Sequence, residues 1–202
     1  MSSKDSSGWR EAKRRAAHES IVDAAWRLVR AQGLAGLSLR ELAKEAGITT
    51  PTVYAYFESK DAIYDAMFRR AATEFTEWMT RPSAASDPDA ALAEGMHRFL
   101  EFCTSDAARY QLLFQRTIPG FEPSAEAYEP AQRALGAARQ RLAAAGIDDP
   151  RHLDIWTALN TGLVDQQVSN DPGGHRWSDL VDDVVAMFLS YCRGTPGRRK
   201  RT

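Results

Sequence analysis

Hydrophobic residues recur with helical spacing along most of the chain, and no segment shows the strict alternation that predicts a β-strand. The first such run predicts a helix that begins near Glu11 and ends at Gly33, with an apolar stripe formed by Ile21, Ala25, Leu28 and Val29. Later runs predict a long helix over residues 59–80, which Ser59 can cap, and further helices up to the last apolar run, which contains Leu180 and Phe188. One of these helices ends at Gly146, and Pro130 either starts it or kinks an earlier start. The pattern therefore predicts an all-α fold.

Two short helices are predicted between these long ones. Ser38 begins the first, with Glu41 placed as its capping-box partner, and Gly47 ends it. Thr49 caps the second, whose first turn tolerates Pro51. Two helices of a few turns, joined by a tight turn at a glycine, are typical of a helix-turn-helix.

The second helix of such a motif enters the major groove of DNA, so its two sides have different roles. Ile48, Val53 and Phe57 are expected to face inward and to fix the angle between the two helices. The outward side carries hydroxyls and aromatic rings, which suit contacts with phosphates and thymine methyl groups: Thr49, Thr50, Thr52, Tyr54 and Tyr56. None of these makes a bidentate contact with a base, so base reading is expected to depend on Arg40 from the preceding helix.

Length and charge fit this interpretation. The 202 residues, 44% of them hydrophobic, suit one DNA-reading unit and one domain with a sizeable core. Residues 1–60 carry 10 lysines and arginines against 7 acidic residues, whereas the remainder carries 16 against 20. This asymmetry suits a DNA-facing head on an acidic body, although a solvated basic arm accounts for it equally well. No apolar run approaches the roughly 20 residues that span a bilayer, and the N-terminus is not a signal peptide, so we expect a cytoplasmic protein without a membrane partner.

Candidate catalytic and metal-ligating residues are few. Cys103 and Cys192 fit no disulfide or metal spacing and are expected to be free thiols, and the four histidines are scattered. The sequence contains no nucleophile elbow, phosphate-cradling glycine loop or metal-binding histidine pair. We therefore expect neither an enzyme nor a bound metal or cofactor.

Residues 38–61 carry three closely spaced motifs: Ala-Gly-Ile-Thr, then Val-Tyr-x-Tyr-Phe, then Ser-Lys-Asp. They resemble the signature of the tetracycline-repressor (TetR) family, and the resemblance covers roughly residues 17–64. It implies a bacterial transcriptional repressor whose homodimer binds a palindromic operator and is released by a small, hydrophobic effector; a DNA-binding regulator without an effector is the alternative. Positions that family members use on DNA are matched here by Arg40, Thr49, Thr50, Thr52, Tyr54, Tyr56 and Lys60.

Pattern and resemblance together suggest how the chain is divided. We expect a disordered arm (1–10), a helix-turn-helix domain (11–58), a helical effector-binding and dimerisation domain (59–193) and a disordered basic tail (194–202). Around Trp156 and Gly162 the chain resembles more weakly a subgroup in which a tryptophan is followed by His-Gly-Leu. Here Asn160-Thr161 precedes the glycine, with one residue more in the spacing.

The second half of the chain holds the candidates for effector binding and dimerisation. Its aromatic and methionine side chains form either a plain core or the lining of an apolar cavity: Met96, Phe99, Phe102, Tyr110, Phe114 and Trp156. Asn160, Asp165 and Gln166 could orient a ligand, cross a dimer interface or face water, and Asn160 is included among the ligand candidates. By resemblance the last two long helices would form a four-helix dimer interface, with these candidates: Leu159, Leu163, Gln166, Val184 and Phe188.

Overall fold

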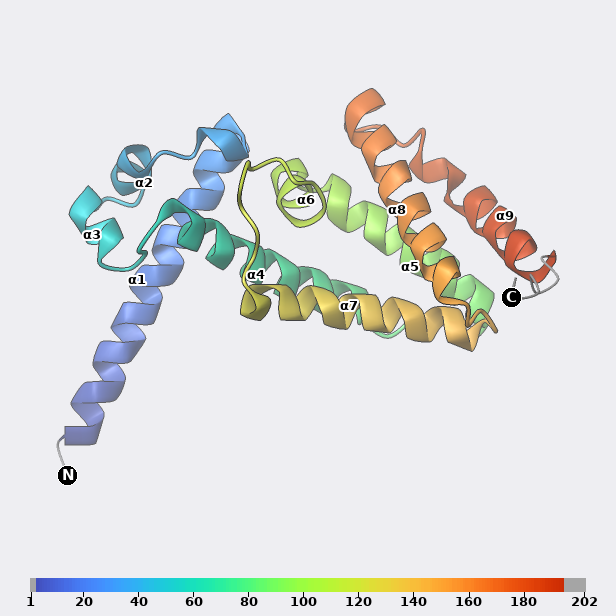
Figure 1. Ribbon diagram of the computed structural model, residues 1–202, viewed down its shortest axis with the longest axis horizontal. Helices are drawn as coiled ribbons and strands as arrows, with labels where there is room; N and C mark the ends of the chain where they lie inside the picture. The colour runs from blue at the N-terminus through green and yellow to red at the C-terminus, as the bar shows by residue number, and fades with distance from the viewer. Residues whose placement is uncertain (1–2, 195–202) are drawn as a thin grey trace, which may run out of the picture. The chain divides into compact units, whose positions relative to one another are not determined.

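The computed structural model describes residues 3–194, with side chains from residue 8 onward. Within that range every regular element is helical, which confirms the predicted all-α fold. The helices are α1 (Ser3–Gln32), α2 (Leu39–Glu45), α3 (Thr50–Tyr54), α4 (Lys60–Met79), α5 (Pro88–Thr104), α6 (Ala107–Phe114), α7 (Ala125–Ala144), α8 (Pro150–Asn170) and α9 (Val181–Gly194), with 3-10 turns at Leu34–Gly36 and Ser178–Leu180 (Figure 1).

The chain divides into two compact units, and the division differs from the boundary we expected at residue 59. The first unit comprises residues 1–72 and 111–128, and the second comprises 73–110 and 129–202. Contacts between residues far apart in sequence explain why 111–128 belongs to the first unit. The ring of Tyr128 stacks on Phe68 with centroids 6.1 Å apart, and the backbone N–H of Ser124 donates to Asp65 at 2.6 Å.

Helix α1 is longer than the sequence predicts. It begins at Ser3 and not near Glu11, so the expected disordered arm is helical from residue 3. A contact one turn apart favours this extension, because the ammonium of Lys13 lies 5.3 Å from the centre of the Trp9 ring. The expected basic tail lies outside the described residues, except for Gly194 at the end of α9.

The core of the first unit forms where α1, α2, α3 and the start of α4 pack together. The predicted α1 positions Ile21, Ala25 and Val29 are buried, while Leu28 is half-buried. Two ion pairs reinforce the packing at its edge. Arg27 pairs with Glu45 of α2 at 2.6 Å, and Arg70 of α4 pairs with Asp23 of α1 at 2.5 Å.

In the second unit α5 packs against both α8 and α9 (Figure 1). Helices α8 and α9 run antiparallel, because His152 and Trp156 early in α8 contact Tyr191 and Phe188 late in α9, with ring centroids 5.9 and 5.0 Å apart. The end of α4 adds Phe75 to this core. Its ring meets Phe99 and Phe102 of α5 edge-on, with centroids 5.8 and 5.2 Å apart.

Most predicted helix ends are confirmed. Gly33, Gly47 and Gly146 have φ values of 79°, 68° and 76°, as expected for glycines that follow a helix. The capping box at Ser38 does not form: Ser38 is extended, its hydroxyl makes no capping hydrogen bond, and the first turn of α2 is closed by the Leu42 N–H donating to the Ser38 carbonyl at 2.8 Å.

Pro130, which from sequence either started its helix or kinked an earlier start, lies inside α7. The helix begins five residues before it, where the Ser124 hydroxyl accepts from the Ala127 N–H at 3.1 Å. The Pro130 carbonyl also accepts a 2.7 Å hydrogen bond from the Thr76 hydroxyl, which ties α7 to α4.

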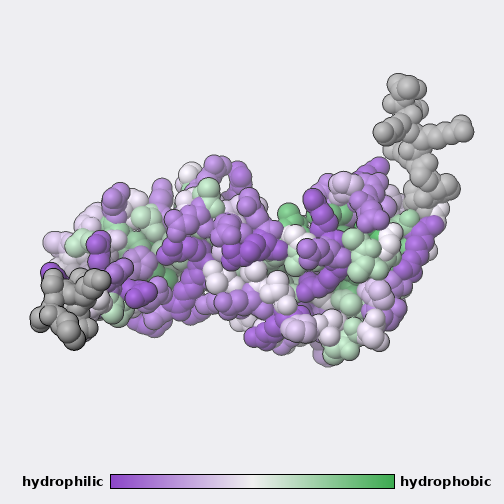
Figure 2. Space-filling view, turned by 90° about the horizontal axis from the view of Figure 1, so that it is seen from below, coloured by the Kyte–Doolittle hydropathy of each residue, from purple (hydrophilic) through white to green (hydrophobic). Residues whose placement is uncertain are grey.

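Hydrophilic residues cover much of the face shown in Figure 2, and apolar residues reach the surface there in separate areas. Among residues 8–194 the large apolar side chains that are exposed are Trp9, Tyr54, Tyr128, Leu135, Leu180, Met187 and Tyr191. No helix in the described part of the chain is long and apolar enough to cross a lipid bilayer.

Candidate nucleic-acid interface

The turn between α2 and α3 is built as the sequence predicts. Helix α2 ends at Glu45, and Gly47 takes a positive φ of 68°, which few residues other than glycine adopt readily. The backbone N–H of Ile48 then donates back to the carbonyl of Ala43 at 2.9 Å. This closure reverses the chain within four residues and sets α3 across α2.

Thr49 forms the predicted cap of α3. Its hydroxyl oxygen accepts a hydrogen bond from the backbone N–H of Thr52 at 3.3 Å and lies 2.8 Å from the hydroxyl oxygen of Thr52. Pro51 occupies the first turn, where backbone N–H groups have no acceptor within the helix, so the lack of an N–H in proline costs no hydrogen bond. Two of the predicted DNA-contacting hydroxyls are therefore held together at the N-terminus of α3.

The inner side of α3 anchors it to α1. Val53 is fully buried and Phe57 is 4% exposed, which confirms their predicted inward orientation. The imidazole of His18 lies against the Phe57 ring, with centroids 4.4 Å apart. Burial lowers the pKa of His18, so its neutral form is favoured in this contact.

The start of α4 is fixed by a second cap and a buried tyrosine. The Ser59 hydroxyl accepts from the Ala62 N–H at 3.1 Å, as predicted, and the Tyr64 hydroxyl donates to the Leu34 carbonyl at 2.5 Å. Burial, with a smaller contribution from Asp61, raises the pKa of Tyr64 to about 12. The ammonium of Lys60 lies 5.4 Å from the centre of the Tyr64 ring.

All seven residues predicted to contact DNA belong to the first unit, and their exposure fits an outward role. Arg40 on α2 and Thr49 are exposed, Tyr54 is 53% exposed, and Thr50, Thr52, Tyr56 and Lys60 are half-buried. Short hydroxyls and aromatic rings therefore cover the outer side of α3 and the turn that follows it.

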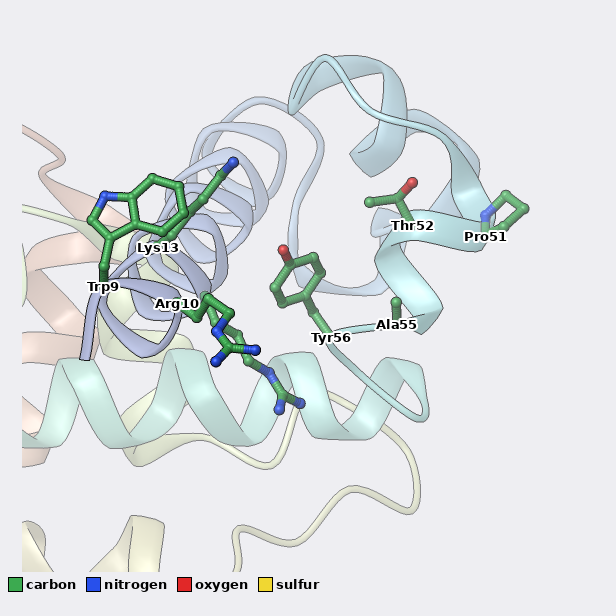
Figure 3. A pocket seen from close by; sticks show the side chains of 8 residues that line it. Trp9, Arg10, Lys13, Pro51, Thr52, Ala55 and Tyr56 are labelled. Atoms are coloured by element: carbon green, nitrogen blue, oxygen red, sulfur yellow. The ribbon is translucent and has the colours of Figure 1, made fainter. Parts of the chain in front are cut away.

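Sequence reasoning missed a groove beside this surface (Figure 3). Its volume is about 710 Å³, and it is lined by Trp9, Arg10, Lys13 and Arg14 of α1 and by Pro51, Thr52, Ala55 and Tyr56. The spacing of Arg10, Lys13 and Arg14 was the available signal, because residues three and four apart share a helix face. The assignment of residues 1–10 to a disordered arm concealed it.

Six of the seven effector candidates are buried in the second unit: Met96, Phe99, Phe102, Tyr110, Trp156 and Asn160. Phe114 differs, because it belongs to the first unit and lines a separate cavity of about 360 Å³ together with Phe68, Phe121 and Tyr128. Residues 111–128 join the first unit through contacts that the helical pattern does not reveal.

Two of the six buried candidates use polar side-chain atoms inside the unit. The Tyr110 hydroxyl donates to Asp165 at 2.7 Å, and the Asn160 side-chain amide donates to the Trp156 carbonyl at 2.8 Å. The three roles left open for Asp165 and Asn160 thus gain a fourth: Asn160 is buried and bonds to its own helix, and Asp165, although exposed, accepts a hydrogen bond from a buried tyrosine.

The dimer candidates fall into two groups. Leu163 and Phe188 are 8% and 2% exposed, so they pack in the core of their own unit and retain little surface for a partner. Leu159 and Val184 are half-buried and Gln166 is exposed. On α9, the exposed apolar residues Met187 and Tyr191 share a face with Val184, and Leu180 lies exposed in the 3-10 turn just before the helix. Our sequence-based choice of residues did not include Leu180, Met187 or Tyr191.

Sequence reasoning also missed the role of Gln167, which is 3% exposed. Its side-chain carbonyl accepts from the backbone N–H groups of Trp177 and Ser178 at 2.9 and 3.3 Å, and its amide donates to the Asp171 carbonyl. This one side chain organises the connection from α8 to α9.

Comparison with known proteins decides the family. Residues 21–67 match the family described as bacterial regulatory proteins, tetR family. The chain is 31% identical over 193 residues to the HTH-type transcriptional regulator EthR of Mycolicibacterium smegmatis, a match that covers 87% of this chain and 86% of that protein. The chain belongs to the TetR family.

Solved structures of TetR-like fold agree with this assignment. The regulatory protein SCO4313 superimposes with a TM-score of 0.73 at 22% identity, over 89% of this chain and 98% of that one. The transcriptional regulator FadR from Bacillus subtilis, crystallised with stearoyl-CoA, gives 0.70 at 19% identity, over 85% and 97%. These likenesses concern the fold. In this TetR-family chain all seven residues predicted to contact DNA lie within the matched segment 21–67. The α1 residues that line the groove precede that segment.

Proposed function

We propose that this TetR-family protein is a transcriptional repressor whose homodimer binds a palindromic operator through α3. The observation that carries the proposal is the capped recognition helix, anchored inward by Val53 and Phe57 and covered outward by hydroxyls and aromatic rings. Base reading falls to Arg40, and phosphate contacts fall to Thr49, Thr50, Thr52, Tyr54, Tyr56 and Lys60. Lys60 stands at the N-terminus of α4, where a phosphate also meets free backbone N–H groups.

A dimer is required because one recognition helix reads only half of a palindrome. Two such helices must lie about 34–36 Å apart to enter successive major grooves. The apolar face of α9, formed by Val184, Met187 and Tyr191 and continued by Leu180 just before the helix, supports pairing with a second copy. Three of these side chains are exposed, and hydrophobic residues of this size seldom gather on a solvated helix face. Leu159 and Gln166 of α8 belong to the same proposed interface.

Release by a small hydrophobic effector completes the proposal. The Bacillus subtilis FadR structure contains stearoyl-CoA, and the structure of another relative in fold, RolR, contains resorcinol. The aromatic cores of both units supply surfaces of matching chemistry here, around Phe99 and Phe102 in one and Phe114 in the other. Helix α4 contributes residues to both units, so it is the element through which an effector would shift the population of DNA-competent dimers.

A band-shift with the DNA upstream of the protein's own gene, at two salt concentrations, tests the DNA-binding function. We expect specific, salt-sensitive binding that Tyr56→Ala and Lys60→Ala each weaken. Arg133→Ala removes one exposed positive charge from the second unit and should leave binding intact. Absence of specific binding, both to this DNA and to duplexes selected from random sequence, would refute the proposal.

The same assay separates the two regulatory alternatives. Long-chain acyl-CoA thioesters and small phenols are the first compounds to test. Weakening of the protein–DNA complex by one of them supports an effector-controlled repressor. If no compound of a broad library weakens it, the protein acts without an effector.

A further inference from the structure

The groove between α1 and α3 has one strongly basic wall. Arg10, Lys13 and Arg14 contribute three positive charges from a single turn of α1, and none of the eight lining residues is acidic. The cluster gives this wall of the groove a positive charge, which attracts an anion.

The opposite wall is part of the DNA-reading surface. Thr52 and Tyr56 line the groove and are also among the residues proposed to contact DNA. Figure 3 shows the Tyr56 side chain in the space between α1 and α3. A ligand in the groove would therefore touch the recognition helix and the basic turn of α1 together.

Trp9 adds a large apolar surface at the end of the groove. Its side chain is 66% exposed, and the ammonium of Lys13 lies 5.3 Å from its ring centre. An exposed indole beside cations suits a ligand that alternates anionic groups with apolar ones. The sugar–phosphate backbone of DNA has this character, because a deoxyribose separates each phosphate from the next.

We propose that this groove binds the sugar–phosphate backbone of one operator strand, beside the major groove that α3 enters. Arg10 and Arg14 lie four residues apart, a rise of about 6 Å along the helix, so the side chains of this wall can reach successive phosphates of one strand. Arg10, Lys13 and Arg14 then contact neighbouring phosphates, and Trp9 packs on a sugar. The inference rests on the proposed DNA binding and extends it to a part of the chain that precedes the matched segment 21–67.

The salt dependence of binding tests the inference. The probe is a duplex selected from random sequence by the wild-type protein. Each lost phosphate contact lowers the slope of log Kobs against log salt by about 0.9, which at 0.1 M salt weakens binding about eightfold per contact. We expect this change for Arg10→Ala, Lys13→Ala and Arg14→Ala, and a loss near 2.7 in slope for the triple variant. Arg14→Lys should retain the wild-type slope.

Arg15→Ala is the matched control, because it removes one charge from the same exposed turn at a residue that does not line the groove. A slope that changes equally for Arg15→Ala would mean that α1 attracts DNA only through its overall charge, and would overturn the inference. Circular dichroism of each variant checks that α1 remains helical. All four side chains are exposed, so their removal leaves no cavity in the core.

Phosphate ethylation interference locates the contact. Ethylation of the phosphates that Arg10, Lys13 and Arg14 contact should block binding of the wild type but not of the triple variant. Ethylation of the phosphate that Lys60 contacts should interfere with binding of both proteins. Identical interference patterns for wild type and triple variant would overturn the inference and leave the repressor proposal intact. Failure of the wild type to bind any duplex would instead overturn both.

Discussion

The hydroxyl of Tyr64 in α4 donates a 2.5 Å hydrogen bond to the carbonyl oxygen of Leu34, in the turn that follows α1. The bond is buried and joins residues 30 positions apart. It holds the start of α4 against the helix-turn-helix, at the place where the Lys60 ammonium rests over the Tyr64 ring. Tyr64 thus supports Lys60, a residue that we propose contacts DNA, and its contribution to stability can be tested separately from DNA binding.

Tyr64→Phe removes the hydrogen bond and keeps the ring under Lys60. We expect the free energy of unfolding to fall by about 1 kcal/mol, measured as a lower urea midpoint. DNA affinity at low temperature should be unchanged. The matched control is Tyr54→Phe, at a tyrosine that is 53% exposed, which should not alter the midpoint. Equal effects of the two substitutions would show that the Leu34 bond contributes nothing.

His18 should make stability depend on pH. Burial holds its pKa in the folded protein below the ordinary value of 6.5, so the unfolded chain binds a proton more readily. The folded state should therefore lose stability as the pH falls through 6.5, and be unaffected by this group above that range. The nearby charges of Arg69 and Arg14 act in the same direction, while Glu19 opposes them.

The measurement is the urea midpoint at several pH values, for wild type and for His18→Phe. The phenyl ring keeps the contact with Phe57 but cannot titrate, so the variant should lose less stability on acidification. His175→Asn, at a histidine with an 85% exposed side chain, should behave like the wild type. A pH dependence that is the same in all three proteins would contradict the assignment to His18.

Gln167→Ala should destabilise the second unit by about 2 kcal/mol, because the N–H groups of Trp177 and Ser178 lose their acceptor. The neighbouring Gln166 offers a close control. It is exposed and bonds only to Asn170 among the contacts of its side chain that the structure describes, at 2.7 Å. Gln166→Ala should therefore change the thermal midpoint little, and a comparable loss in both variants would mean that Gln167 does not organise the connection.

Met187→Glu tests the proposed dimer interface. Met187 is 59% exposed on the apolar face of α9, so a charge there costs the folded protomer little but would be buried without a partner in the dimer. We expect the dimer dissociation constant to rise by at least about tenfold, measured by sedimentation at several concentrations. Ala186→Glu places the same charge on the polar side of α9 and should leave association unchanged. Equal behaviour of the two variants would place the interface elsewhere.

Much of the helix-turn-helix was predictable because it depends on local chemistry. Thr49 and Ser59 cap their helices as expected, because capping depends on a side chain and a backbone N–H only three residues away. Val53 is buried as expected, because helical spacing sets the inward face of α3. Phe57 follows the helix and is buried as well, with its backbone N–H bonded to the Val53 carbonyl at 2.9 Å. Where a rule of this kind failed, as at Ser38, backbone bonds closed the helix instead.

The parts that depend on distant contacts were not predictable. Helical spacing places Leu163 and Phe188 on the apolar faces of their helices. It does not show whether such a face packs in the core of its own unit, as both residues do here, or against a partner. Phe114 joins the first unit because its segment is tied to α4 by contacts of Ser124 with Asp65, 59 positions apart, and of Tyr128 with Phe68. Gln167 looks like any polar residue on a helix until the connection to α9 folds back onto it.

The N-terminal part of α1 has a consequence for how the protein meets its target. Residues 8–16 are all exposed, and Gly8 is a poor helix former, so this stretch is stabilised mainly by its own backbone hydrogen bonds. In the free protein its amide protons should exchange with solvent quickly, far faster than those near Val29 or Val53. An occupied groove would slow that exchange, and the entropy lost in restraining this turn of helix would lower the affinity for DNA.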